Sequence, residues 1–177
     1  FTGAPLKNVA LSAGGVRVRG ECMIASDGIE GGAVYALSPQ LREAGTVLHI
    51  DLKPDVTEAH VAERLARPKG KDSRSTFLRK ALNLSPLAVA LMREAGSDNP
   101  KQVTLTVQGP AGIARAISTA GGVSFDEVTD HFRLRKNPNT WVAGEMLDWD
   151  APTGGYLLQA CFATARFAAE DCLRQFK

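Results

Sequence analysis

The 177 residues of the chain suffice for one large domain or two small ones with a buried core. Hydrophobic residues make up 44% and charged residues 23%, as in ordinary globular proteins, and no apolar run approaches the ~20 residues that a membrane span requires. The formal net charge of +2 is too small to indicate a polyanionic partner by itself.

The cysteines and histidines argue against a disulfide framework and against a metal centre. Cys22, Cys161 and Cys172 form no Cys-x-x-Cys pair, and the three histidines have no metal-ligand spacing among themselves or with the cysteines. An odd, sparse number of cysteines favours free thiols in a reducing compartment. We therefore expect a cytoplasmic protein without a metal site.

The amino-terminal third predicts strands. Apolar residues 9–11 and the alternating residues 16–24 flank a Gly-Gly turn, which is typical of a β-hairpin. Residues 26–32 are predicted to be a loop. The apolar run 33–37 fits a strand or a helix, because period alone does not decide. Residues 46–52 alternate as a strand does.

Three helices are predicted next. Thr57 is placed to cap a helix that runs through residue 67, and Ser73 or Ser75 to cap the second. Ser85 is followed by proline, which is well tolerated in a first turn, and begins the third helix.

The remainder of the chain predicts four short strands and one long helix. The helix is expected from about residue 155 to residue 172. The strands are expected at residues 102–107, 114–120, 132–135 and 140–143.

A basic run covers residues 64–79. Such a run can contact phosphate, as in an RNA-contacting module, but the interpretation we favour is a solvated loop that leads into a helix. It lacks the interleaved aromatic residues of single-strand binders. We do not expect nucleic acid as a partner.

The most informative segment begins at Trp141, where a strand is followed by acidic residues and then by Gly154 and Gly155 at the start of the long helix. A helix start exposes unpaired N–H groups and a partial positive charge, and glycine lets a planar or anionic ligand approach the backbone. A glycine pair alone is equally explained by a buried turn that lets the helix pack closely.

The whole string is more specific. It reads Gly-Glu-Met-Leu-Asp at residues 144–148 and Gly-Gly-Tyr-Leu-Leu-Gln at 154–159, with Thr-Ala-Gly-Gly-Val at 119–123 and Asp-Gly-Ile-Glu-Gly-Gly-Ala-Val at 27–34. These blocks resemble, in order, the signature of the HI0933-like family of FAD-dependent oxidoreductases. The block at 27–34 departs from the family, which often has Ser where this chain has Glu30 and Pro where it has Gly32.

The resemblance implies an α+β fold. Residues 1–119 would be a β-rich insert domain with a helical subunit, in which residues 33–37 are helical. Residues 120–177 would be the returning strand–loop–helix half of a two-dinucleotide-type FAD-binding domain.

The resemblance also implies a cofactor site. Glu145 would bond the ribityl chain of FAD, and the amides of Gly155, Tyr156 and Leu157 would face the pyrimidine edge of the flavin. Asp148 would either order the loop or touch the ligand. The full expected set is Gly144, Glu145, Asp148, Gly154, Gly155, Tyr156, Leu157, Thr119, Gly121 and Gly122. No residue stands out as a catalytic acid or base.

The chain has no Gly-x-Gly-x-x-Gly fingerprint after a strand, which a dinucleotide site needs for the pyrophosphate. We therefore expect half of an FAD site, in a fragment whose partner is the amino-terminal segment of the same protein, with NAD(P)H and a small molecule as substrates of the complete enzyme. The alternative is a non-enzymatic binding or interaction module that does not bind FAD alone.

Overall fold

The computed structural model describes residues 1–175, without the side chain of Arg115. The chain divides into two compact units, Phe1–Pro110 and Ala111–Lys177, which we call the sheet unit and the helix unit. Each is described by itself.

The sheet unit begins with the expected hairpin. Strands β1 (Pro5–Ala13) and β2 (Val16–Ile24) pair antiparallel across a turn in which Gly14 and Gly15 have φ of 54° and 79°. Glycine takes such angles without a steric penalty, so the Gly-Gly turn directs the pairing. The hairpin prediction is confirmed.

Three further strands complete an antiparallel sheet in the order β3-β2-β1-β4-β5. Strands β4 (Val47–Asp51) and β5 (Val103–Thr106) confirm the strands predicted at these places. The two-residue strand β3 (Ile29–Glu30) lies inside the segment predicted to be a loop, so that prediction was partly wrong. The sheet is curled into half a barrel.

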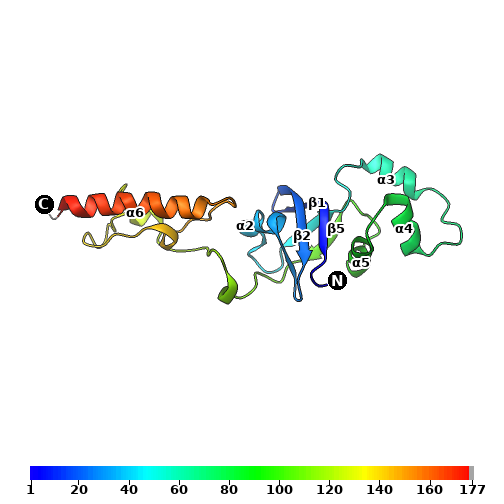
Figure 1. Cartoon of the computed structure of the whole chain (residues 1–177), viewed down its shortest axis with the longest axis horizontal. Helices are drawn as coiled ribbons and strands as arrows, with labels where there is room; N and C mark the ends of the chain where they lie inside the picture. The colour runs from blue at the N-terminus through cyan, green and yellow to red at the C-terminus, as the bar shows by residue number, and fades with distance from the viewer. Residues whose placement is uncertain (176–177) are drawn as a thin grey trace. The chain divides into compact units, whose positions relative to one another are not determined.

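Short helices α1 (Gly32–Tyr35) and α2 (Ser38–Leu41) follow β3. The segment that could have been a strand is therefore helical, as the family resemblance implied. In Figure 1 these two helices lie at one end of the sheet, and the next three helices lie at the other.

Those three helices are α3 (Glu58–Leu65), α4 (Arg74–Leu82) and α5 (Pro86–Glu94). Each begins at a hydroxyl side chain that accepts a hydrogen bond from a backbone amide in the first turn, and the caps are Thr57, Ser73 and Ser85. Helix α3 ends two residues before the predicted limit.

The strands and the helices of the sheet unit share one hydrophobic core. Leucines and branched residues of β1 and β4 meet the apolar sides of the helices. The buried set is Leu6, Val9, Leu11, Ala13, Cys22, Ala33, Leu37, Leu41, Leu48, Ile50, Leu52, Val61, Leu78, Leu82, Leu84, Leu87, Ala88, Val89, Met92 and Val103.

The helix unit has little regular structure besides helix α6 (Tyr156–Gln175), which confirms the predicted long helix. Three single turns of 3-10 helix, η1 (Ile113–Arg115), η2 (Phe125–Glu127) and η3 (Gly144–Met146), precede it. Its core cluster consists of Val128, Val142 and Leu147. Every helix within residues 1–175 is too short or too polar to cross a bilayer.

Three strand predictions in the helix unit were wrong. Residues 114–120 include the end of η1 and no strand, and Ile117 is exposed. Residues 132–135 and 140–143 form only isolated bridges, such as Arg133 with Trp141. A strand needs a neighbour along its whole length. Phe132, with φ of 61°, also leaves the extended conformation at the first position of the predicted strand 132–135.

Candidate functional site

The candidate site of the helix unit is built around the turn η3. Glu145 in this turn accepts two hydrogen bonds through Oε1, from the backbone amide of Thr119 at 2.6 Å and from its hydroxyl at 3.1 Å. The two residues are 26 positions apart in the chain. The fold therefore brings together two of the residues that the sequence singled out.

The segment after Thr119 runs beside the segment after Glu145. Val123 donates to the carbonyl of Met146 at 2.8 Å and accepts from the amide of Asp148 at 2.9 Å. A side chain on Gly122 would place its Cβ 2.5 Å from the Met146 carbonyl oxygen, so only glycine fits there. Gly121, Gly122 and Asp148 thus belong to the same small assembly as Glu145 and Thr119.

The assembly is anchored to α6 by residues that the sequence did not single out. The amide of Gly144 donates to Oγ1 of Thr164 at 2.9 Å, and this hydroxyl donates to the carbonyl of Ala160 at 2.7 Å. A Cβ on Gly144, whose φ is 66°, would lie 3.0 Å from Sγ of Cys161. Thr164 and Cys161 therefore set the position of η3. They lie three residues apart on α6, a spacing that carries no signal of this role.

The remaining candidates form the start of α6. Gly154 and Gly155 have φ of 121° and 86°, and space around Gly155 is open on the side where a Cβ would stand. The first helical amides, those of Tyr156 and Leu157, have no intrahelical acceptor, and the first turn carries no acidic side chain. Cys161, which touches η3, is five residues into the helix, or about 7.5 Å along its axis.

These groups offer two complementary kinds of hydrogen bonding. Glu145 is half-buried; its Oε1 accepts from Thr119, and within residues 1–175 its Oε2 accepts no hydrogen bond. The start of α6 supplies donors and a partial positive charge. A hydroxylated chain bonded to a planar ring with acceptor atoms fits this donor and acceptor set. The side chain of Asp148 is exposed, and its amide is already bonded to Val123.

One side of α6 is apolar and exposed. Leu158, Phe162 and Leu173 are 63%, 70% and 65% exposed, and the exposed Ala165 and Ala169 lie between them. Their spacings of three and four residues put all five on one side of the helix, which we call the apolar face.

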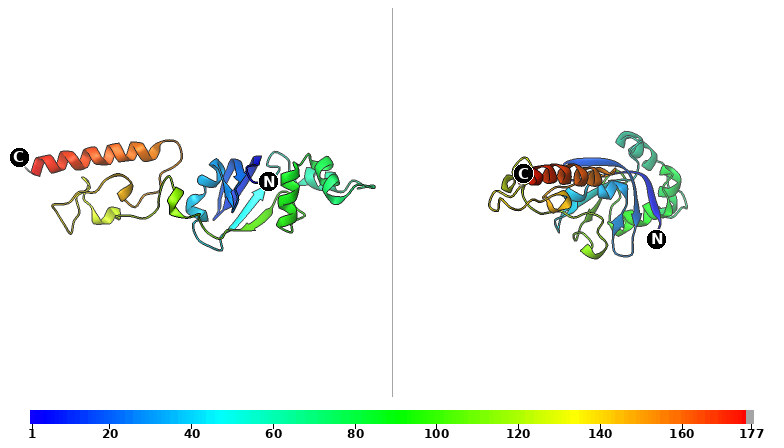
Figure 2. Two further views of the ribbon diagram at one scale, coloured as in Figure 1. Left: turned by 60° about the horizontal axis from the view of Figure 1, so that its bottom comes forward. Right: turned by 60° about the vertical axis from the view of Figure 1, so that its left-hand side comes forward.

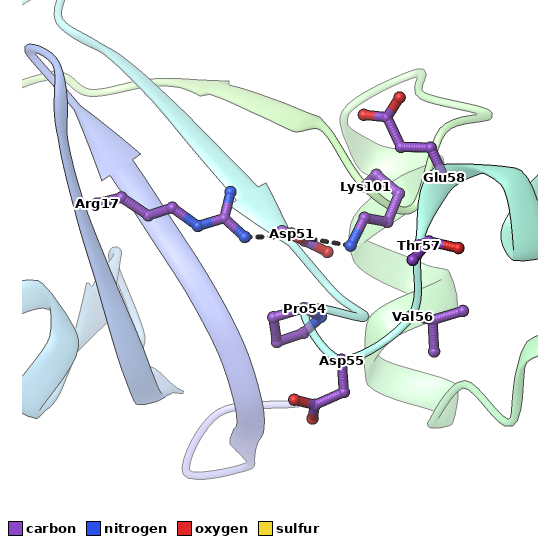
Figure 3. Close-up of a pocket in the computed structure, with 8 residues that line it drawn as sticks. All are labelled: Arg17, Asp51, Pro54, Asp55, Val56, Thr57, Glu58 and Lys101. Atoms are coloured by element: carbon purple, nitrogen blue, oxygen red, sulfur yellow. Dashed lines mark hydrogen bonds and ion pairs between the residues drawn. The ribbon is translucent and has the colours of Figure 1, made fainter.

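The sheet unit has a charged cleft of about 320 Å³ at the end of β4 (Figure 3). Its centre is Asp51, only 4% exposed, whose Oδ2 lies 2.8 Å from both a guanidinium nitrogen of Arg17 and Nζ of Lys101. Oδ1 accepts from the amide of Lys53 at 2.9 Å. Both carboxylate oxygens thus have partners, and Asp51 acts as the anchor of an ion cluster.

Asp55 lines the same cleft. It accepts from Nδ2 of Asn8 at 2.7 Å and from Arg19 at 2.6 Å. These hydrogen bonds, first that of Asn8 and then that of Arg19, hold the pKa of the Asp55 carboxyl below its usual value. Asp51 and Asp55 are thus both held by cationic side chains, which is the arrangement of a structural cluster.

In a comparison with protein-family models, residues 1–121 match the model described as "HI0933-like protein barrel and H2TH domain". The match covers the whole sheet unit, which contains the half-barrel and the three capped helices, and more than half of the chain.

Proposed function

Because the chain belongs to the HI0933-like family, which is associated with FAD-dependent oxidoreductases, we propose that its helix unit forms one wall of an FAD site in such an enzyme. The observation that carries the proposal is the junction of Glu145 and Thr119 on a turn anchored to α6. The sheet unit would be the insert domain, with the boundary near residue 119 and the returning part of the FAD domain from residue 120.

In this proposal Glu145 binds the ribityl chain. Its Oε2 accepts a ribityl hydroxyl, while the two hydrogen bonds from Thr119 to Oε1 keep the carboxylate from rotating away. Asp148 orders the segment through its amide, since that amide is bonded to Val123. The contacts of Gly122 keep the two segments in register.

The start of α6 would meet the pyrimidine edge of the ring. The amides of Gly155, Tyr156 and Leu157 would donate to it, and the helix start would stabilise negative charge there. When bound, the flavin supplies hydride transfer, and the protein groups set its position and its potential. The open space at Gly155 leaves the backbone accessible to a planar ring.

Residues 1–177 hold no Gly-x-Gly-x-x-Gly motif. In this proposal the pyrophosphate of FAD is therefore bound by a dinucleotide-binding segment outside these residues. The apolar face of α6 would pack against that segment, which removes exposed leucine and phenylalanine from water. NAD(P)H would reduce the flavin, and the reduced flavin would pass the hydride to a small-molecule substrate. The cytoplasm suits the three free cysteines.

The proposal is tested on a protein that includes both this chain and the dinucleotide-binding segment. Glu145→Gln removes the charged acceptor while preserving shape. We expect FAD affinity, measured by quenching of flavin fluorescence, to fall about 10- to 100-fold, the value of a hydrogen bond to a charged group. The matched control is Glu170→Gln on α6, an exposed acid paired with Arg166, and it should leave the affinity unchanged. Equal FAD affinity in the Glu145 variant and the control would overturn the proposed role.

A further inference from the structure

The charge of the chain is concentrated in the α3–α4 region. Residues 64–80 hold seven basic residues and one acid, whereas the rest of the chain has fourteen basic and eighteen acidic residues. A small net charge for the whole therefore hides a strongly positive segment on an otherwise acidic chain. We call residues 64–80 the basic segment; it includes the end of α3, a connecting loop and α4.

Only some of the basic side chains of the basic segment have an acidic partner within the described residues. Arg67, Arg74 and Lys80 form ion pairs, with Glu63, Asp98 and Asp72 in that order. The members that form no hydrogen bond or ion pair with their side chains, among the described residues, are Arg64, Lys71 and Arg79.

The field of these charges reaches a neighbouring lysine. The pKa of Lys53 is lowered, first by burial and then by the positive charge of Arg64, which Asp55 only partly offsets. Arg64 and Lys53 are thus two cationic side chains that interact electrostatically at this place in the fold.

The start of α4 adds to the same surface. The first turn of this nine-residue helix has no acidic side chain, and its cap Ser73 accepts from the amide of Thr76. The amides of Arg74 and Ser75 are left without an intrahelical acceptor. The connecting loop projects away from the sheet in both Figure 1 and the left view of Figure 2, so a bulky partner can approach it.

The side chains of the basic segment indicate which kind of anionic partner fits it. Its large apolar residues Phe77 and Leu78 are buried, and Leu65 packs, partly buried, against the core of the unit. The segment has no exposed aromatic ring to stack on single-stranded bases and no exposed large apolar side chain to enter a bilayer. The lack of aromatic residues, which led us not to expect nucleic acid, thus argues against single strands alone, because a duplex is held through its phosphates.

We propose that the basic segment binds the phosphate backbone of a nucleic-acid duplex without reading its sequence. The surface lies in the sheet unit and is separate from the residues proposed to hold FAD.

The test uses the whole chain and a fluorescent DNA duplex of about 20 base pairs, with binding followed by anisotropy between about 50 and 200 mM salt. The variant R64Q/K71Q/R79Q removes the three unpaired charges. The matched control K7Q/K136Q/R174Q removes three exposed charges elsewhere. Circular dichroism verifies that both remain folded, and the single variant Lys71→Gln, in the exposed loop, repeats the test with the least structural risk.

We expect the chain and the control to bind the duplex with the same affinity. The R64Q/K71Q/R79Q variant should bind at least about tenfold more weakly at low salt, with a salt slope smaller by about 3, since each lost phosphate contact removes about 0.9. An RNA duplex in a parallel titration distinguishes the two sources of duplex phosphate, and binding to either supports the proposal. Equal affinities of the two triple variants would overturn it. So would binding to single strands or to phosphatidylserine vesicles without binding to a duplex.

Discussion

The two units of this chain differ in how completely they bury their own apolar residues. In the sheet unit twenty buried residues form one core under a five-stranded sheet and its helices. In the helix unit the core cluster has three, while Leu158, Phe162 and Leu173 stand exposed on α6. The sheet unit has the core of an independent domain; the helix unit has an anchored turn, a long helix and an uncovered face.

The difference bears on where function lies. The sheet unit buries its apolar residues in its own core, as a domain inserted into another one must. In its charged cleft, Asp51 forms ion pairs with Arg17 and Lys101 of the same unit. The helix unit has an exposed apolar face on α6 and a carboxylate at Glu145 that bonds Thr119 through one oxygen. These two features are the reason that the FAD site is proposed for the helix unit.

The largest expected effect comes from the core of the sheet unit. Leu48 is fully buried, and Leu48→Ala should lower the free energy of unfolding by about 3 to 4 kcal/mol, through lost burial and a cavity. The matched change Leu158→Ala, on the apolar face of α6, should cost less than about 0.5 kcal/mol. Urea denaturation followed by far-ultraviolet circular dichroism measures both. Equal losses would mean that the apolar face is already covered, and the contrast between the units would fail.

The ion cluster of the sheet unit gives the next effect. Asp51→Asn leaves Lys101, whose side chain is 11% exposed, without its counter-charge, and should cost about 3 kcal/mol of unfolding free energy. Asp98→Asn removes a carboxylate from an exposed pair with Arg74 and should cost less than about 1 kcal/mol. A small loss for Asp51→Asn in the same denaturation experiment would show that the cluster contributes little to the unit.

The helix unit should respond locally. Gly122→Ala forces a Cβ against the Met146 carbonyl and should cost about 1 to 3 kcal/mol of local stability. Gly112→Ala, at φ of −60° with open space around it, should cost nothing measurable. Amide hydrogen exchange reports the result as faster exchange at Val123 and Asp148. Unchanged exchange at those two amides would contradict the close packing described for this turn.

The smallest effect on stability concerns the thiols. Cys22 is buried in the sheet unit, and burial, with the nearby charge of Glu21, raises the pKa of its thiol to about 11. At pH 8 it should react with a disulfide reagent about 100-fold more slowly than the partly exposed Cys161 and Cys172 of the helix unit. Absence of a slow third thiol, or its persistence in Cys22→Ala, would contradict this assignment.

The thiol of Cys22 should make the free energy of unfolding fall at alkaline pH. The folded chain holds the proton of Cys22 more tightly than the unfolded chain does, because the pKa is raised on folding. The stability that the neutral thiol contributes is therefore complete below about pH 8.5 and is lost as the pH rises toward about 11. Cys22→Ala should flatten that alkaline loss.

Local signals predicted most of the sheet unit. Hydroxyl caps at Thr57, Ser73 and Ser85 act on amides three residues away, so their effect is visible in a short window of sequence. The turn at Gly14 and Gly15 is equally local. Strand predictions succeeded where a partner strand exists and failed at residues 114–120, since alternation shows what a strand would bury but not whether a neighbour is present.

The site was less accessible to prediction. Glu145 was singled out through a family resemblance, and its hydrogen bonds with Thr119 join positions that no periodicity relates. Thr164 and Cys161 were not found, because a threonine on a helix more often bonds only to its own helix. The bond from the Gly144 amide appears only when the chain is folded.

The most direct test of the central proposal is the visible absorption spectrum after addition of FAD and removal of the excess. It compares this chain with a longer protein that also contains the dinucleotide-binding segment. We expect bound-flavin bands in the longer protein and none in residues 1–177 alone. Flavin retained by residues 1–177 alone would remove the need for the second segment, and a colourless longer protein would contradict the assignment of the helix unit to an FAD site.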